Sequence, residues 1–366
     1  MQCPRCLNED PHYFYFGSTG YYCRKCVNFK RILLDDVPEA SFYYDGRALD
    51  GEYQLAFNLT PAQLSISNQL ADMIDKTDVL VHAACGAGKT EIVMQSIRKY
   101  LEKGKSVGFT TPRRQVVIEL GKRLSQAFSH IEVVWVCEGY TVKTSGDLIV
   151  CTTHQLYRYP KKFDLLILDE PDAFPYKGND VLKGIVRNSC RGHIIYLTAT
   201  PDQELSCLPT LSLFRRPHGY DLTVPRIVYC LNGLSYLVLF HWLRKHRRAL
   251  IFVPTIKMSL RLAKLLHVPA FNSKTPDKDQ LIDQFRQGKW PFLVCTTVLE
   301  RGITISNIDV CIFNGEHVVF DVASLVQIMG RIGRDINYPT GEGLIICHHR
   351  ERKIDECLQT IRMMNA

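Results

Sequence analysis

The chain has 366 residues, and at about 150 residues per domain this length predicts two or three compact units and excludes a single small module. Hydrophobic residues make up 46% of the chain and charged residues 22%, which excludes a disordered, collagen-like or disulfide-scaffold protein. The net charge is +8, and from Pro225 onward 19 Lys and Arg oppose 12 Asp and Glu, so the basic excess lies in the C-terminal part. Such an excess fits either a polyanionic partner or a plain charged surface.

Cysteine usage indicates a reducing compartment. The 14 cysteines lie in a long chain whose apolar residues can form a core without a disulfide framework. No run of the sequence approaches the ~18 apolar residues of a membrane helix, and the first residues lack the apolar stretch of a signal peptide. We therefore expect a soluble cytoplasmic protein, although docking on a membrane partner stays open.

Residues 1–58 are predicted to form a small zinc-binding module. Four cysteines follow the spacing C-x2-C-x16-C-x2-C, which is typical of a zinc ribbon: Cys3, Cys6, Cys23 and Cys26. A disulfide or redox role for them is disfavoured in a reducing compartment. The aromatic residues of the module either fill its small core or stack on bases, and we favour the core: Tyr13 to Phe16, Tyr21 and Tyr22.

From Leu59 onward, short apolar runs alternate with helical stretches, which predicts an α/β fold of parallel sheets with helices on both faces. Two sets of predicted strands flank a Pro- and Gly-containing linker at 215–225: 79–81, 107–109, 148–150, 165–168 and 194–197 before it, and 249–253, 292–295, 310–313 and 344–347 after it. We predict two α/β domains, at 59–222 and 223–366.

A phosphate-binding loop follows the first predicted strand. The sequence resembles a Walker A loop that precedes a helical stretch, except that Ala83 stands where the strict pattern has glycine. Glycines let successive backbone N–H groups converge on phosphate oxygens, Lys89 supplies charge for the β and γ phosphates, and the Thr90 hydroxyl binds Mg²⁺. We predict that ATP binds at Ala84, Cys85, Gly86, Ala87, Gly88, Lys89 and Thr90. Cys85 is interpreted as a residue that suits the tight turn.

Adjacent acidic residues follow the predicted strand 165–168. A carboxylate at such a strand end can reach Mg²⁺, and its neighbour can orient or deprotonate the attacking water. Asp169 is therefore the predicted Mg²⁺ ligand and Glu170 the predicted base.

Two arginines spaced three apart follow Gln327, and they share one face if the segment is helical. Their guanidinium groups are suited to neutralise charge that develops on the γ phosphate. Because Arg331 and Arg334 lie far along the chain from the phosphate loop, we expect the second α/β domain to supply them. Closure of the two domains on ATP then couples hydrolysis to movement.

In this order, the motifs resemble those of helicase superfamily 2 over residues 59–350. The resemblance implies two tandem RecA-like domains with ATP and nucleic acid bound across their cleft. It adds further ATP-contacting residues, Gln63, Gly302 and Gln327, and the coupling residues Thr198 and Thr200. It also implies a set of contacts to the backbone phosphates of nucleic acid: Thr111, Arg113, Thr152, Thr153, His154 and Thr296.

Three features narrow this resemblance to the ComFA family of bacterial competence: the four-cysteine module, the residues 172–176 that continue the acidic motif, and a final motif that begins with Gln327 instead of His. Pro171 departs from the usual acidic motif. The resemblance implies DNA-stimulated ATP hydrolysis and translocation along single-stranded DNA. The cofactors it implies, with the residues above, are ATP, Mg²⁺ and Zn²⁺.

The same resemblance implies partners and a location: ComFC, DprA and the ComEC uptake channel, at the inner face of the cell membrane and without membrane insertion. One alternative is a replication-restart or RNA helicase of superfamily 2, which the Gln-initiated motif and the N-terminal zinc module disfavour. The other is a non-enzymatic nucleic-acid-binding scaffold, which the intact Lys89, Asp169 and Glu170 disfavour.

Overall fold

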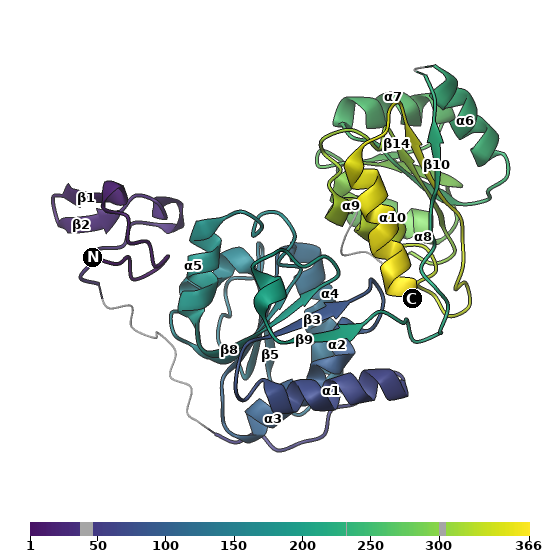
Figure 1. Ribbon diagram of the computed structural model, residues 1–366. Coiled ribbons are helices and arrows are strands. Elements are labelled where there is room, and N and C mark those ends of the chain that lie inside the picture. The colour runs from purple at the N-terminus through teal and green to yellow at the C-terminus, as the bar shows by residue number, and fades with distance from the viewer. Residues whose placement is uncertain (37–46, 232, 300–304) are drawn as a thin grey trace. The chain divides into compact units, whose positions relative to one another are not determined.

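The structure is a computed structural model that describes residues 1–366 except 37–46, 232 and 300–304 (Figure 1). The chain divides into two compact units, one of residues 1–83 and 88–213 and one of residues 84–87 and 214–366. The predicted α/β class with parallel sheets is confirmed in both units. The predicted domain boundaries stay predictions, and Gly302 lies outside the described residues.

The N-terminal module is a short β-hairpin with two single-turn helices (Figure 1). Its elements are η1 (Pro11–Tyr13), β1 (Phe14–Gly17), β2 (Gly20–Cys23) and η2 (Val27–Phe29). The four predicted zinc-ligand cysteines are buried beside this hairpin. Among the described aromatic residues of the module, only Phe14 and Phe29 are grouped with the apolar cluster around the cysteines.

The expectation that the aromatic rings of the module fill its core is wrong for most of them. Tyr13 is 41% exposed, Tyr15 53%, Phe16 65% and Tyr21 44%. A hairpin of two four-residue strands has too little interior for so many rings, and the cysteine cluster already occupies that interior.

The module packs against the helix α5 (Asp180–Ser189) of the first unit. The Asn188 side-chain amide donates to the Pro4 carbonyl oxygen at 2.9 Å. Gly184 lies where a Cβ atom would come within 1.9 Å of the Cys6 carbonyl oxygen, so only glycine permits this backbone approach. Glycine inside a helix costs about 1 kcal/mol relative to alanine, and here close packing of the module requires it.

The first unit contains a parallel seven-stranded sheet in the order β5-β6-β4-β7-β8-β3-β9. Its strands are β3 (Val79–Ala83), β4 (Val107–Thr111), β5 (Val133–Val136), β6 (Leu148–Thr152), β7 (Phe163–Asp169), β8 (Cys190–Thr198) and β9 (Thr210–Leu213). The central strands are continuous buried apolar runs, as expected for a parallel sheet covered on both faces.

The helices of the first unit connect these strands. They are α1 (Pro61–Met73), α2 (Lys89–Ile92), α3 (Met94–Glu102), α4 (Arg114–Ala127), η3 (Thr153–Arg158), α5 and η4 (Leu205–Cys207). Because all strands of the sheet are parallel, the loops after β3, β4, β6, β7 and β8 emerge at one edge, where α/β proteins bind ligands.

The second unit contains a parallel six-stranded sheet in the order β10-β15-β14-β11-β13-β12. The strands are β10 (Arg226–Tyr229), β11 (Ala249–Phe252), β12 (Ala270–Phe271), β13 (Phe292–Cys295), β14 (Asp309–Phe313) and β15 (Gly343–Cys347). The helices are α6 (Leu234–Leu243), α7 (Ile256–Leu266), α8 (Lys278–Arg286), η5 (Thr297–Leu299), α9 (Val322–Met329) and α10 (Arg352–Asn365). Among the described helices, none has the length and apolar character needed to cross a bilayer.

Candidate functional site

The predicted phosphate loop connects β3 to α2. Gly86 has φ +83° and Gly88 has φ +88°, a left-handed conformation that glycine adopts without strain. The chain reverses tightly here, because the Ala87 N–H donates to the Ala84 carbonyl oxygen at 3.1 Å. Lys89 and Thr90 follow as the first residues of α2. Turned glycines next to a helix start aim backbone N–H groups at one point, which is the geometry that holds phosphate oxygens.

Gln63 lies against this loop from α1. Thr60 caps α1, and the two residues form a reciprocal pair in which the Thr60 N–H donates to Gln63 Oε1 at 2.9 Å and the Gln63 N–H donates to Thr60 Oγ1 at 3.3 Å. Gln63 is buried, and its amide nitrogen lies 2.3 Å from where a Cβ atom on Gly88 would stand. The structure therefore brings the predicted adenine-reading residue and the phosphate loop together.

The predicted acidic pair lies at the end of β7. Asp169 is the last residue of the strand, and Glu170 follows with a φ of +56°, which is uncommon for a residue with a side chain. The Glu170 N–H donates to the Leu197 carbonyl oxygen of β8 at 2.9 Å. Both side chains are half-buried. This turn sets the backbone positions from which the side chains of Asp169 and Glu170 extend.

Asp172 connects the acidic motif to the predicted coupling residues. The Thr198 hydroxyl donates to Asp172 Oδ1 at 2.6 Å, and the Thr200 hydroxyl donates to Asp172 Oδ2 at 2.9 Å. Thr198 Oγ1 in turn accepts from the Thr200 N–H at 3.0 Å. Asp172 is only 6% exposed, and its role as the partner of both threonines was not predicted. Two signals could have predicted this pairing. Asp172 follows Asp169 by three residues, and the Thr-x-Thr segment 198–200 lies at the end of the next strand, β8.

The predicted nucleic-acid residues of the first unit follow β4 and β6, which are neighbours in the sheet. Thr111 and Thr152 are register partners at the ends of these strands. Thr111 and Thr153 are fully buried, and their hydroxyl groups have no hydrogen-bond partner among the described residues. Arg113 is half-buried at the start of α4, whereas His154 is exposed. Arg113 and His154 are therefore the members of this group that a nucleic acid can reach directly.

The His154 ring stacks on Phe29 of the N-terminal module, with centroids 5.9 Å apart and ring planes 26° apart. This packing removes water from one face of the imidazole and lowers the pKa of His154. In the second unit, Thr296 follows β13, is 6% exposed, and also has a hydroxyl without a partner among the described residues.

The predicted arginine motif lies at the end of α9. Asp321 caps this helix through its Oδ1 atom, which accepts from the Ser324 N–H at 2.8 Å. The helix ends at Met329, so Arg331 and Arg334 lie in the following turn and do not share a helical face. Arg331 is 1% exposed, and Arg334 is half-buried with its Nε donating to the Gly330 carbonyl oxygen at 2.9 Å.

Arg216, which the sequence assigned to the linker, is a buried residue that holds this turn. Its Nη1 donates to the carbonyl oxygens of Ile332 at 2.5 Å and Gly333 at 2.8 Å, and its Nη2 donates to that of Gly330 at 2.7 Å. Burial lowers the pKa of Arg216 to about 10, with a further contribution from the nearby Arg334 charge. The side chain therefore stays charged at neutral pH. Two adjacent arginines in a polar linker do not indicate which of them is buried or that either holds a turn.

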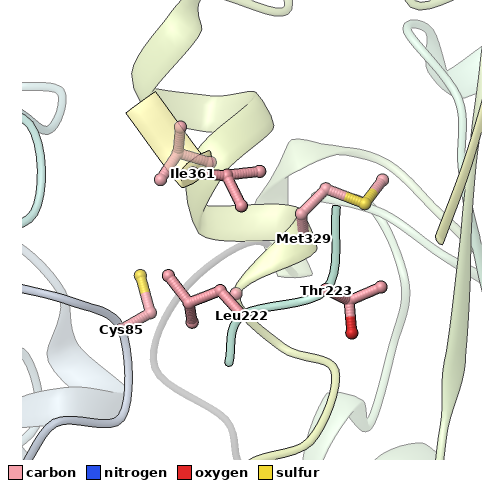
Figure 2. A pocket seen from close by; sticks show the side chains of 7 residues that line it. Cys85, Leu222, Thr223, Met329 and Ile361 are labelled. Atoms are coloured by element: carbon pink, nitrogen blue, oxygen red, sulfur yellow. The ribbon is translucent and has the colours of Figure 1, made fainter. Parts of the chain in front are cut away.

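Residues 84–87 group with the second unit, and Cys85 makes two contacts there. Its Sγ donates to Gln327 Oε1 at 3.0 Å, and its carbonyl oxygen accepts from Arg216 Nε at 2.8 Å. Beside it is a shallow depression without room for a water molecule, lined mainly by apolar side chains (Figure 2): Cys85, Leu222, Thr223, Val326, Met329, Gly330 and Ile361. Typical ligand pockets enclose roughly 300–1,000 Å³, so this depression is not one of them.

The four predicted zinc ligands come together. Their sulfur atoms all lie within 4.8 Å of one another, with Cys3 and Cys26 sulfurs 3.7 Å apart and Cys6 and Cys23 sulfurs 3.8 Å apart. A tetrahedral Zn²⁺ with Zn–S bonds of about 2.3 Å requires sulfur separations of about 3.8 Å, whereas a disulfide requires about 2 Å. The cluster therefore has the geometry to hold one zinc ion.

Two known protein families match the chain, one over most of the first α/β region and one within the second. Residues 56–203 match the family described as Type III restriction enzyme, res subunit, and residues 231–335 match the family described as Helicase conserved C-terminal domain. Competence protein ComFA of Streptococcus pneumoniae is 35% identical over 99% of this chain and 90% of its own length. The chain belongs to the ComFA family.

Competence protein ComFA of Bacillus subtilis is 31% identical over 100% of this chain and 85% of its own length. Among solved structures, Mss116p bound to single-stranded RNA and AMP-PNP has a TM-score of 0.64 at 18% identity, over 79% of this chain and 70% of its own, which shows the fold alone. This ComFA-family chain is thus an ATP-dependent, helicase-like motor of a competence family with two RecA-like domains. Its predicted site residues stay predictions.

Proposed function

We propose that this ComFA-family protein uses ATP hydrolysis to move along single-stranded DNA and acts in DNA uptake during bacterial transformation. The observation that carries the proposal is the hydrogen bonding of Asp172 to both Thr198 and Thr200. It ties the acidic motif at the end of β7 to the end of β8. A movement of the acidic motif when ATP is hydrolysed is therefore transmitted through Asp172 to the end of β8.

The ATP site in this proposal uses the residues around the phosphate loop. Bound Mg²⁺ supplies charge neutralisation at the phosphate oxygens. The Thr90 hydroxyl and Asp169 hold this ion, Lys89 pairs with the phosphates, and Glu170 takes the proton of the attacking water. The remaining contacts come from Gln63, residues 84–88, Gly302 and Gln327, and the arginines Arg331 and Arg334 neutralise charge on the γ phosphate.

DNA binding in this proposal is independent of base sequence, because it uses backbone phosphates. Arg113 and His154 provide the accessible contacts of the first unit, and the unpartnered hydroxyls of Thr111, Thr153 and Thr296 fit the need for donors to phosphate oxygens. Thr152 completes the set. Alternating grip and release by these residues through the ATP cycle moves the strand.

Zinc binding by the four cysteines is part of the proposal. A module with two four-residue strands buries too little apolar surface to fold alone, and metal binding supplies the missing free energy. Partners in the proposal are ComFC, DprA and the ComEC uptake channel, and the place of action is the inner face of the membrane. The ComFA family supports both, because its members are named as competence proteins.

ATP turnover with different polymers tests the proposed function. The protein is assayed without polymer and with single-stranded DNA, duplex DNA or RNA, and each assay is repeated with Lys89→Ala. We expect single-stranded DNA to give the largest stimulation, and Lys89→Ala to abolish turnover. Turnover that no polymer changes would contradict the motor function, stimulation by RNA alone would indicate an RNA helicase, and turnover that survives Lys89→Ala would contradict the assigned ATP site.

A further inference from the structure

One face of the N-terminal hairpin carries the exposed ring of Tyr15 and the half-buried ring of Tyr22 together with cationic side chains. Tyr15 and Tyr22 are register partners on β1 and β2, so their rings lie on the same face. Their centroids are 5.9 Å apart, with ring planes at 67°. Tyr13, the last residue of η1, directly precedes β1 and is exposed. We call Tyr13, Tyr15 and Tyr22 the tyrosine face.

Each ring of the tyrosine face has a cation beside it. The Arg24 guanidinium lies 5.3 Å from the Tyr15 centroid, and the Arg31 guanidinium lies 4.3 Å from the Tyr22 centroid. The Lys25 ammonium lies 5.3 Å from the Tyr13 centroid. Flat rings interleaved with flexible cations are the surface that a single-stranded nucleic acid needs, since bases stack on the rings and phosphates pair with the cations.

The other face of the hairpin provides a contrast. Phe16 and Tyr21 are register partners there, with centroids 4.9 Å apart. Both rings are exposed, whereas Tyr22 on the tyrosine face is half-buried, and among the described residues neither Phe16 nor Tyr21 has a cation over its ring. Both faces therefore carry aromatic rings, but only the tyrosine face has cations beside them.

The module also lies next to the predicted DNA contacts of the first unit. Phe29 stacks on His154, and the Arg5 guanidinium lies 5.9 Å from the centroid of Tyr157, three residues after His154. The module therefore lies beside His154, and the tyrosine face is on the side of the hairpin opposite Phe14 and Cys23, which pack toward the first unit.

We propose that the tyrosine face is a stacking platform for single-stranded DNA, on which bases stack against Tyr15 and Tyr22 while Arg24 and Arg31 bind the adjacent phosphates. The inference rests on the proposed function and extends it, because it adds a second binding surface to the same strand. The zinc cluster's role here is to hold the hairpin in place.

Binding of a fluorescein-labelled oligothymidylate to the full chain tests this platform. We expect Tyr15→Ala/Tyr22→Ala to raise the Kd about thirtyfold or more, since the loss of each of the two stacking rings weakens binding by at least about fivefold. Tyr15→Phe/Tyr22→Phe keeps both rings and restores the affinity. The control Phe16→Ala/Tyr21→Ala, on the opposite face of the same hairpin, changes the Kd by less than about twofold. Equal zinc content of all variants, by elemental analysis, shows that the module is intact.

The outcomes separate this inference from the proposed function. If the wild-type protein does not bind the oligonucleotide, the proposed function fails. If the wild type binds and Tyr15→Ala/Tyr22→Ala binds equally well, or the Phe16→Ala/Tyr21→Ala control loses the affinity instead, the platform is wrong and the motor function stands. Photocrosslinking with 5-iododeoxyuridine gives a direct readout: we expect crosslinks to the peptide that contains Tyr15, and crosslinks confined to residues of the two α/β folds would overturn the proposal.

Discussion

The acidic motif of the first unit and the arginine motif of the second are held in place in opposite ways. The acidic motif lies at a strand end, and Asp172 fixes it through bonds between side chains, to Thr198 and Thr200. The arginine motif follows a helix, and Arg216 fixes its turn by donating to main-chain carbonyl oxygens. The side-chain partners Thr198 and Thr200 belong to a motif that can be recognised in the sequence. The partners of Arg216 are main-chain carbonyl groups, which every residue has, so the sequence does not indicate them.

This difference indicates different consequences of mutation. Removing a partner of Asp172 alters communication between two strand ends that the sheet still holds. Removing Arg216 takes the side-chain donor from the carbonyl oxygens of Ile332 and Cys85, whereas those of Gly330 and Gly333 keep Arg334 and His218, so the turn loses part of its support. We therefore expect the arginine motif to be the more fragile of the two.

Arg216→Ala has the largest expected effect. Loss of the buried donor destabilises the second unit by about 3 kcal/mol, because each buried acceptor left without a partner costs about 1–3 kcal/mol. We also expect kcat for ATP to fall more than KM rises, since the turn that holds Arg331 is displaced. Urea unfolding and ATP kinetics measure the two effects.

The neighbouring Arg215 is exposed and provides the matched control. Arg215→Ala should leave both stability and kinetics near the wild-type values, and Arg216→Lys should recover only part of the loss because one ammonium cannot reach as many carbonyl oxygens. Equal losses of stability and of kcat in Arg216→Ala and Arg215→Ala would contradict the claim that Arg216 holds the arginine motif in place.

Asp172→Asn has an intermediate expected effect. The amide group can accept only one of the two hydroxyl hydrogen bonds, so the link between β7 and β8 is weakened. We expect the stimulation of ATP turnover by single-stranded DNA to fall about tenfold more than basal turnover falls, which corresponds to about 1.4 kcal/mol of coupling. The exposed Asp72 of α1, changed to Asn, is the control. A parallel loss of basal and stimulated turnover would mean that Asp172 only supports the acids.

Asp321→Ala has the smallest expected effect. It removes the N-cap of α9, the helix that leads to Gln327 and the arginine turn, at a cost of about 1 kcal/mol. Asp321→Ser keeps a capping oxygen and should restore most of this stability. Thermal unfolding measures the difference, and a loss as large as that of Arg216→Ala would mean that the helix and not the linker arginine holds the motif.

The parallel sheets could be predicted from sequence because their central strands are long apolar runs. All the strand runs predicted after residue 58 coincide with strands. Strands β5, β9, β10 and β12 were not predicted, and each of them is short and lies at the edge of its sheet. β10 is itself an edge strand, and short edge strands carry little apolar signal.

The residues of the candidate site also divide into those that could be predicted from sequence and those that could not. The clustering of the four cysteines, the place of Lys89 at a helix start and the place of Asp169 at a strand end could be predicted because motif spacing indicates them, and their roles stay predictions. The burial of Arg216 and the exposure of the module's aromatic rings could not, because both depend on how far-separated segments pack. The tyrosine face in particular follows from the small interior of a two-stranded hairpin, which residue type alone does not indicate.

Displacement of streptavidin from biotin at one end of a single-stranded DNA tests the central claim most directly. We predict that the wild-type protein displaces streptavidin from one end when ATP is present, and that Glu170→Gln binds the same DNA without displacing it. DNA-stimulated ATP turnover with no displacement from either end would contradict translocation.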